Sequence, residues 1–137
     1  MAKKLYLRNV KNKGRGVFCT AAITEGDDIE ICPLLLLAPE DYDVLSSSHL
    51  YDYCFSYNRE QNHEALALGF GSLYNHATDN NASYSINREN KTIRFYAIKD
   101  IPAHTEISVN YGGEPGVEYK KWFEDRGLKY IGSFPSL

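Results

Sequence analysis

The chain has 137 residues, of which 43% are hydrophobic and 24% charged, and its 15 basic and 18 acidic side chains give a net charge of −3. This length suits a single domain, and the composition excludes a disordered or fibrous chain. The acidic balance argues against direct nucleic-acid binding, which depends on clustered Lys and Arg. The most apolar run, residues 33–39, is far shorter than the ~20 residues of a membrane-spanning helix. We therefore expect a protein of the cytoplasm or nucleus with no membrane segment.

The first forty residues predict strands separated by turns. Partly alternating residues 5–10 and the apolar residues 17–19 flank the turn 12–16, which predicts a hairpin or strand pair. A second turn precedes a strand at 29–32. Leu34 to Leu37 predict a continuous, buried strand with Pro33 and Pro39 marking its ends.

The next segment, residues 39–64, is strongly acidic. It carries six acidic side chains against one basic side chain, Arg59, and a short helix is expected from Pro39. Such a segment can attract a Lys- and Arg-rich peptide by complementary potential. A solvated surface without a partner is the alternative.

The remaining segments predict another hairpin and little helix. Residues 82–86 and 92–97 flank the polar turn 87–90, and residues 107–111 form a further short strand. A single helical turn is expected at 72–75 and a terminal helix at 118–126, before Gly127. The fold class that follows is mostly β, with few short helices.

The spacing of the cysteines does not indicate a disulfide framework or a zinc site. Cys19, Cys32 and Cys54 are an odd number without the paired short spacing of a zinc or disulfide site. We interpret them as buried, reduced thiols of an intracellular protein. A Cys nucleophile paired with one of the four histidines is the alternative that these residue types allow.

Two motifs contain residues suited to a ligand, although each is ambiguous alone. Gly14-Arg15-Gly16 could bring the backbone close to a ligand, or form a tight turn. Asn75-His76 could anchor a polar ligand, or satisfy buried backbone groups.

The order of three motifs along the chain indicates a protein family, which no single motif does. Gly14-Arg15-Gly16-Val17-Phe18 is followed by the stretch 69–76, which ends in Asn75-His76, and then by Glu106-Ile107-Ser108-Val109-Asn110-Tyr111-Gly112. This order resembles a SET domain, and most closely the small free-standing viral and bacterial members. The resemblance implies a β-clip-like fold, with several short-stranded sheets around a pseudoknotted C-terminal segment. Residues 1–137 would then be one SET domain, with 39–64 as a variable acidic insert and 112–137 as a C-terminal lid.

The resemblance also implies an activity, namely methyl transfer from S-adenosylmethionine to the side-chain amine of a lysine in a protein substrate. The catalytic residue expected from the family is Tyr111. The residues expected at the cofactor are Gly14, Arg15, Gly16, Asn75, His76, Tyr111 and Trp122. Those expected at the substrate are Tyr53, Phe55, Tyr84 and Val109, the last at a position that helps to set the number of methyl groups added. A basic protein substrate such as a histone is expected. The resemblance to the small viral members also makes a homodimer one of the possible oligomeric states.

The sequence departs from the family pattern in the middle motif. Ala77 replaces the usual Ser and Asn80 the usual Pro, and the cysteine cluster that often follows the domain is absent, so no zinc is expected. These changes leave a second hypothesis, a SET-like module that binds cofactor or peptide but has lost catalysis. A third is a small β-rich interaction protein whose motif matches are accidental.

Overall fold

The computed structural model describes residues 4–111, which form a mostly β fold, as predicted. One sheet contains four strands in the spatial order β1-β2-β9-β6: β1 Leu5–Val10, β2 Gly14–Cys19, β9 Glu106–Val109 and β6 Asn75–His76. The other contains five strands in the order β4-β5-β3-β8-β7: β4 Cys54–Asn58, β5 His63–Ala67, β3 Asp28–Leu37, β8 Thr92–Ala97 and β7 Ala82–Asn87. The helices of the described part are short: η1 Pro39–Asp41, α1 Tyr42–Ser46, η2 His49–Tyr53, η3 Arg59–Gln61 and η4 Gly71–Leu73.

Both predicted hairpins are confirmed. β1 pairs antiparallel with β2 from Leu5↔Cys19 to Val10↔Gly14, and β7 pairs in the same way with β8. The first turn contains Asn12 with a φ of 68°, a conformation that Asn tolerates better than most residues. Local turn chemistry therefore specified these pairings.

The prediction of a continuous buried strand between two prolines is wrong. β3 runs through Pro33, and its side chains alternate, with Leu34 8% exposed and Leu35 50% exposed. Pro33 is tolerated inside the sheet because β3 changes partner there: residues up to Pro33 pair with β8, and residues from Leu34 pair with β5.

The final strand is shorter at its end than predicted. β9 begins at Glu106 and ends at Val109, so Tyr111 lies beyond it. The Tyr111 N–H donates to the His76 side chain at 3.0 Å instead of continuing a strand ladder. The helical turn η4 ends at Leu73, before Asn75, and the helix expected at 118–126 lies outside the described residues.

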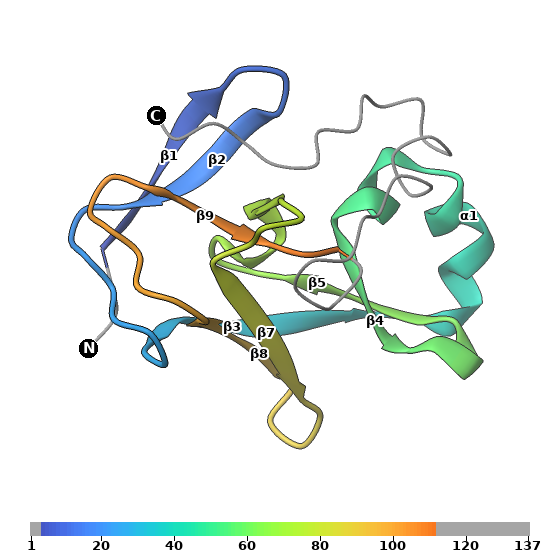
Figure 1. Cartoon of the computed structure of the whole chain (residues 1–137). Helices are drawn as coiled ribbons and strands as arrows, with labels where there is room; N and C mark the ends of the chain where they lie inside the picture. Colours follow the sequence, from blue (N-terminus) through green and yellow to red (C-terminus); the bar gives the residue numbers. More distant parts are fainter. Residues whose placement is uncertain (1–3, 112–137) are drawn as a thin grey trace.

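The core fills the space between the sheets. Val17, Ile107 and Val109 contribute from the four-stranded sheet, and Ile93 and Phe95 from the five-stranded sheet, all at most 1% exposed. Figure 1 shows the β1–β2 hairpin and the α1 region at opposite ends of the molecule, with β9 crossing the middle. The end of β9 is thus directed from the core towards the acidic segment.

Two further observations concern the cysteines and the helices. All three thiols are free; Cys19 and Cys32 are buried and Cys54 is partly buried. Among residues 4–111, no helix has the length and apolar character needed to cross a membrane.

The alternation of β3 predicts different costs for two neighbouring leucines. Leu34→Ala should lower the free energy of unfolding by about 2–4 kcal/mol because it leaves a cavity in the core, and Leu35→Ala by less than about 1 kcal/mol. Urea unfolding of the two variants checks this. Equal losses would instead support the continuous buried strand.

Candidate functional site

The middle and final motifs meet where β6 lies parallel to β9. Asn75 is opposite Ser108 and His76 is opposite Val109. The Ala77 N–H extends this pairing by donating to the Val109 carbonyl at 3.0 Å. The fold therefore brings together two segments that are far apart in the chain.

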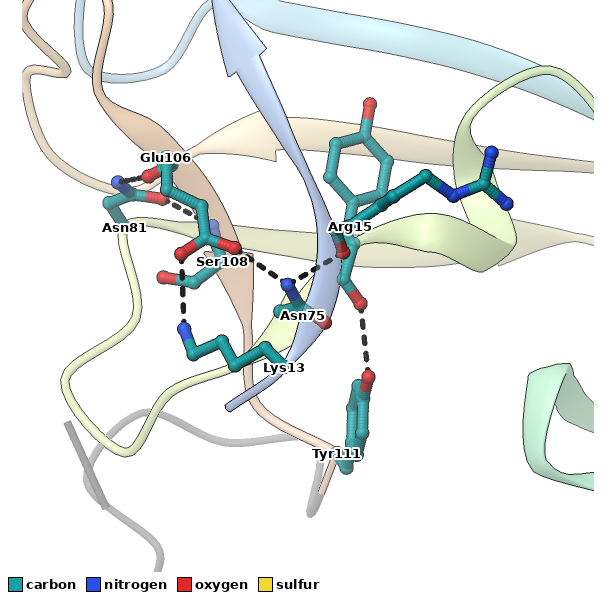
Figure 2. A network of polar contacts seen from close by, with 8 residues as sticks. Lys13, Arg15, Asn75, Asn81, Glu106, Ser108 and Tyr111 are labelled. Atoms are coloured by element: carbon teal, nitrogen blue, oxygen red, sulfur yellow. Dashed lines mark hydrogen bonds and ion pairs between the residues drawn. The ribbon is translucent and has the colours of Figure 1, made fainter. Parts of the chain in front are cut away.

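Glu106, at the start of β9, connects this pair of strands to β2. Its Oε1 lies 3.0 Å from Lys13 Nζ, and its Oε2 accepts a hydrogen bond from Asn75 Nδ2 at 2.8 Å. Asn75 Nδ2 also donates to the Arg15 carbonyl at 3.0 Å (Figure 2). The Lys13 and Glu106 side chains are 4% and 12% exposed, and burial lowers the pKa of Lys13 to about 8 although Glu106 opposes that change.

The two glycines of the first motif lie in different surroundings. A Cβ on Gly16 would overlap the Glu106 carboxylate, so glycine at this position is explained by the close approach of that side chain. Among residues 4–111, no atom lies within 4 Å of a Cβ placed on Gly14, so this part of the chain leaves space beside the start of β2. Arg15 is exposed, and Figure 2 shows its guanidinium directed away from Glu106.

The loop after His76 is attached to β9 by an asparagine. Asn81 Nδ2 donates to the Glu106 carbonyl at 2.8 Å, and Asn81 Oδ1 accepts the Ser108 N–H at 2.9 Å. The neighbouring Asn80, where the sequence departs from the expected motif, is 2% exposed and donates to the Ala82 carbonyl at 2.8 Å. Asn81 therefore fastens this loop to β9, and Asn80 forms a local hydrogen bond at the start of β7.

His76 is neutral at pH 7 and holds the backbone of Tyr111. Burial, followed by the positive charge of Lys13, lowers the pKa of His76 to about 4. Because Nδ1 accepts the Tyr111 N–H, the proton of the neutral ring is assigned to Nε2. The two rings lie 5.1 Å apart.

The Tyr111 hydroxyl donates to the backbone carbonyl of Tyr74 at 3.1 Å (Figure 2). Burial raises the pKa of Tyr111 above its ordinary value, and the neighbouring Tyr53, Glu106 and Asp52 raise it further, whereas a hydrogen bond between the phenol and the His76 backbone lowers it. The phenol therefore stays protonated at neutral pH. This arrangement can orient a reacting group with a fixed hydroxyl and backbone dipoles, but it contains no ionised base at Tyr111.

The residues expected at the substrate lie in different environments. Phe55 on β4 and Tyr84 on β7 have ring centroids 5.1 Å apart, and both lie about 6 Å from Phe95, at 6.1 and 6.0 Å. Phe95 in turn lies 4.6 Å from the Tyr74 ring. Tyr53, at the end of η2, is 38% exposed. Aromatic side chains thus extend from β4 towards the residue that receives the Tyr111 hydroxyl.

Two other expected residues need separate mention. Val109 is 1% exposed and belongs to the hydrophobic core, so its role in setting the number of methyl groups stays a prediction. Trp122, expected to cover the cofactor, lies outside the described residues. Within residues 4–111, no group of three or more His, Cys, Asp or Glu side chains could hold a metal ion.

Sequence reasoning did not assign roles to Lys13, Tyr74, Asn81 or Glu106. Glu106 gave a weak signal, since it is a charged residue directly before the apolar residues of β9. Lys13 and Glu106 are 93 positions apart, so no local pattern could have paired them.

Comparisons with known proteins agree on one family. The model of the SET domain family matches residues 14–112. A histone-lysine N-methyltransferase of Schizosaccharomyces pombe, specific for lysine 37 of histone H3, is 31% identical over 121 residues, covering 88% of this chain and 78% of the relative.

Solved structures resemble the fold. The crystal structure of a Plasmodium falciparum protein described as a histone methyltransferase has a TM-score of 0.69 and 31% identity, covering 83% of this chain and 97% of the other. A polycomb repressive complex 2 from Chaetomium thermophilum, bound to S-adenosylmethionine, has a TM-score of 0.68 and 26% identity. That match covers 93% of this chain and 17% of the longer one.

The buried, neutral state of His76 predicts a loss of stability in acid. Because its pKa is lower in the folded chain, the unfolded chain takes up the proton first. The stabilising contribution is therefore complete above pH 6.5 and is lost as the pH falls from 6.5 towards 4, by up to about 3 kcal/mol. Urea unfolding across this pH range measures the loss of stability. The variant His49→Gln, at an exposed position, should show the same loss as the wild-type chain. An NMR titration with the His76 ring half protonated at pH 6 or above would contradict the prediction.

Proposed function

Because this chain belongs to the SET domain family, we propose that it transfers a methyl group from S-adenosylmethionine to the side-chain amine of a lysine in a protein substrate. The observation that carries the proposal is the Tyr111 hydroxyl, held at the carbonyl that directly precedes Asn75 and His76. The relatives of this chain include a histone-lysine methyltransferase, and we therefore propose an intracellular, basic protein as the class of substrate.

The residues at the start of β2 fit the amino-acid end of this cofactor. Residues 4–111 leave space beside Gly14. Within the same residues the Arg15 guanidinium has no ion-pair partner, so it is available to a carboxylate. Asn75 and His76 would hold the neighbouring part of the cofactor through backbone groups and the amide. When bound, S-adenosylmethionine supplies a methyl group on a positively charged sulfur, which a neutral amine can attack.

The chain's own residues prepare the lysine and align it. A lysine amine has an ordinary pKa near 10.4, and an apolar, aromatic environment favours its neutral form. We propose Tyr53, Phe55 and Tyr84 for that environment. Tyr111 would be the catalytic residue, because its fixed, protonated hydroxyl can orient the amine for attack. Alignment of this kind can lower a barrier by several kcal/mol, to an upper range of ~7–11.

Tyr111→Phe tests the proposed role of the hydroxyl. We expect kcat to fall at least about 100-fold, because an oriented hydroxyl oxygen that can accept a hydrogen bond from the amine is removed, while the Kd of the cofactor stays within about threefold. Labelled methyl transfer onto mixed histones and calorimetric cofactor binding measure the two quantities. The matched control is Tyr57→Phe, which removes a hydroxyl bonded to the Arg88 carbonyl on the β7–β8 turn and should leave both unchanged.

The same assays separate the alternatives. Cofactor binding by the wild-type chain without transfer to any lysine would support the inactive module instead. Absence of cofactor binding would contradict both hypotheses.

The acidic segment supports the proposal of a basic substrate. Glu40, Asp41 and Asp43 are exposed on η1 and α1. The following helix η2 carries Asp52 and Tyr53, which are close enough to Tyr111 to raise its pKa. Negative charge therefore continues from the surface to the site.

Removing two of these surface charges should weaken recognition of the substrate. The double variant Asp41→Asn/Asp43→Asn should raise the KM for a Lys- and Arg-rich peptide about two- to fivefold at low salt, with kcat little changed. The effect should shrink above ~0.3 M salt because screening shortens the range of the charges. Glu89→Gln, on the β7–β8 turn, is the control. A KM that stays constant at low salt would exclude this segment from substrate binding.

A further inference from the structure

A β-bulge in β3 turns a glutamate towards the interior. The register with β8 shifts between Asp28, opposite Tyr96, and Glu30, opposite Phe95. The extra residue, Ile29, is 2% exposed, and Glu30 lies on the inner side next to it, opposite a ring that is fully buried. Strict alternation would have sent one of these two side chains outwards.

The Glu30 carboxylate holds the segment that leads into β6. Its Oε1 accepts the Tyr74 hydroxyl at 2.7 Å, and its Oε2 accepts the Phe70 N–H at 3.1 Å. Within residues 4–111 it has no ion-pair partner, so these hydrogen bonds compensate for its partial burial. The contacts join positions 40 and 44 residues apart.

The backbone of this segment is shaped around the carboxylate. Gly69 has a φ of +65°, and a Cβ there would lie 2.5 Å from Glu30 Oε2. Both facts disfavour any other residue at this position. The absence of a side chain at Gly69 thus allows the Glu30 carboxylate to approach the Phe70 N–H.

Tyr74 transmits this restraint to the candidate catalytic residue. Its side chain is 3% exposed and is bonded at the hydroxyl to Glu30, with Phe95 against the ring. Burial and then the Glu30 charge raise the pKa of Tyr74 well above its ordinary value, so the hydroxyl stays a donor. The backbone carbonyl of the same residue accepts the Tyr111 hydroxyl.

We propose that Glu30 is a positioning residue for methyl transfer: by holding Tyr74 it fixes the carbonyl that orients the Tyr111 hydroxyl. This inference rests on the proposed function. It adds Glu30 and Tyr74 to the site, neither of which touches the reacting atoms through its side chain.

The test is a cycle of variants with Tyr111. Tyr74→Phe retains the ring and the carbonyl but removes the bond to Glu30, and should lower kcat about tenfold with KM and cofactor Kd within about twofold. In the Tyr111→Phe background the same change should have no further effect on single-turnover rates, because the hydroxyl that it orients is absent. Tyr57→Phe should change kcat less than twofold in either background.

A second variant separates positioning from folding. Glu30→Gln keeps the size of the side chain and one acceptor oxygen, so it should give a smaller loss of kcat than Tyr74→Phe, with the fold verified by circular dichroism. In both variants the NMR signal of the Tyr111 ring ¹³Cζ should move, whereas in Tyr57→Phe it should not. This readout needs no catalysis.

Each outcome decides one question. An equal loss of rate in both backgrounds, or an unmoved Tyr111 signal in folded Glu30→Gln and Tyr74→Phe, overturns the inference. A wild-type chain that transfers no methyl group overturns the proposed function instead, and the Tyr111 signal still decides whether Glu30 and Tyr74 set its surroundings.

Discussion

The pairing of β6 with β9 is two residues long, and it brings Asn75 and His76 to the segment that carries Glu106 and Tyr111. Two backbone pairs alone would stabilise such a junction weakly, but side chains reinforce it: Asn75 reaches Glu106, and Asn81 bridges the backbone of β9. Because these groups are largely buried, leaving one of them without a hydrogen-bond partner would cost more free energy than the hydrogen bond contributes when it is formed. The junction therefore tolerates little displacement, which suits the alignment of cofactor and lysine that we propose for this site.

The Glu106 network explains features that could otherwise be attributed to a ligand. Gly16 lacks a Cβ where the carboxylate lies, and Asn75 uses its amide to join β2 to β9. At Gly16 and Asn75 the motifs therefore build the protein itself, whereas at Gly14 no neighbour among residues 4–111 requires a glycine for lack of space. A glycine in a ligand-binding motif is not by itself evidence that the ligand touches it.

Sequence reasoning was most successful where structure is decided locally. The two hairpins were predicted because turn residues lie between short apolar runs, and the family was identified because three motifs occur in one order. The path of β3 through Pro33 was missed, since a change of strand partner leaves no trace in hydrophobic periodicity. The bulge that turns Glu30 inwards and the pair of Lys13 with Glu106 were also missed, because both depend on residues brought together only by the folded chain. The expected positions of Asn75, His76 and Tyr111 came from the resemblance, and their chemical roles stay predictions.

The separation of these partners along the chain has a consequence for how the protein forms. Pairing Val17 with Ile107 closes a loop that contains most of the domain. The chain loses conformational entropy when this loop closes, and it does so before the contacts at the junction can compensate for the loss. We therefore expect the hairpins to form early and the junction to assemble late. A chain still emerging during synthesis would have strands but no site, so a ligand that recognises the junction would bind only the finished molecule and would protect it against unfolding.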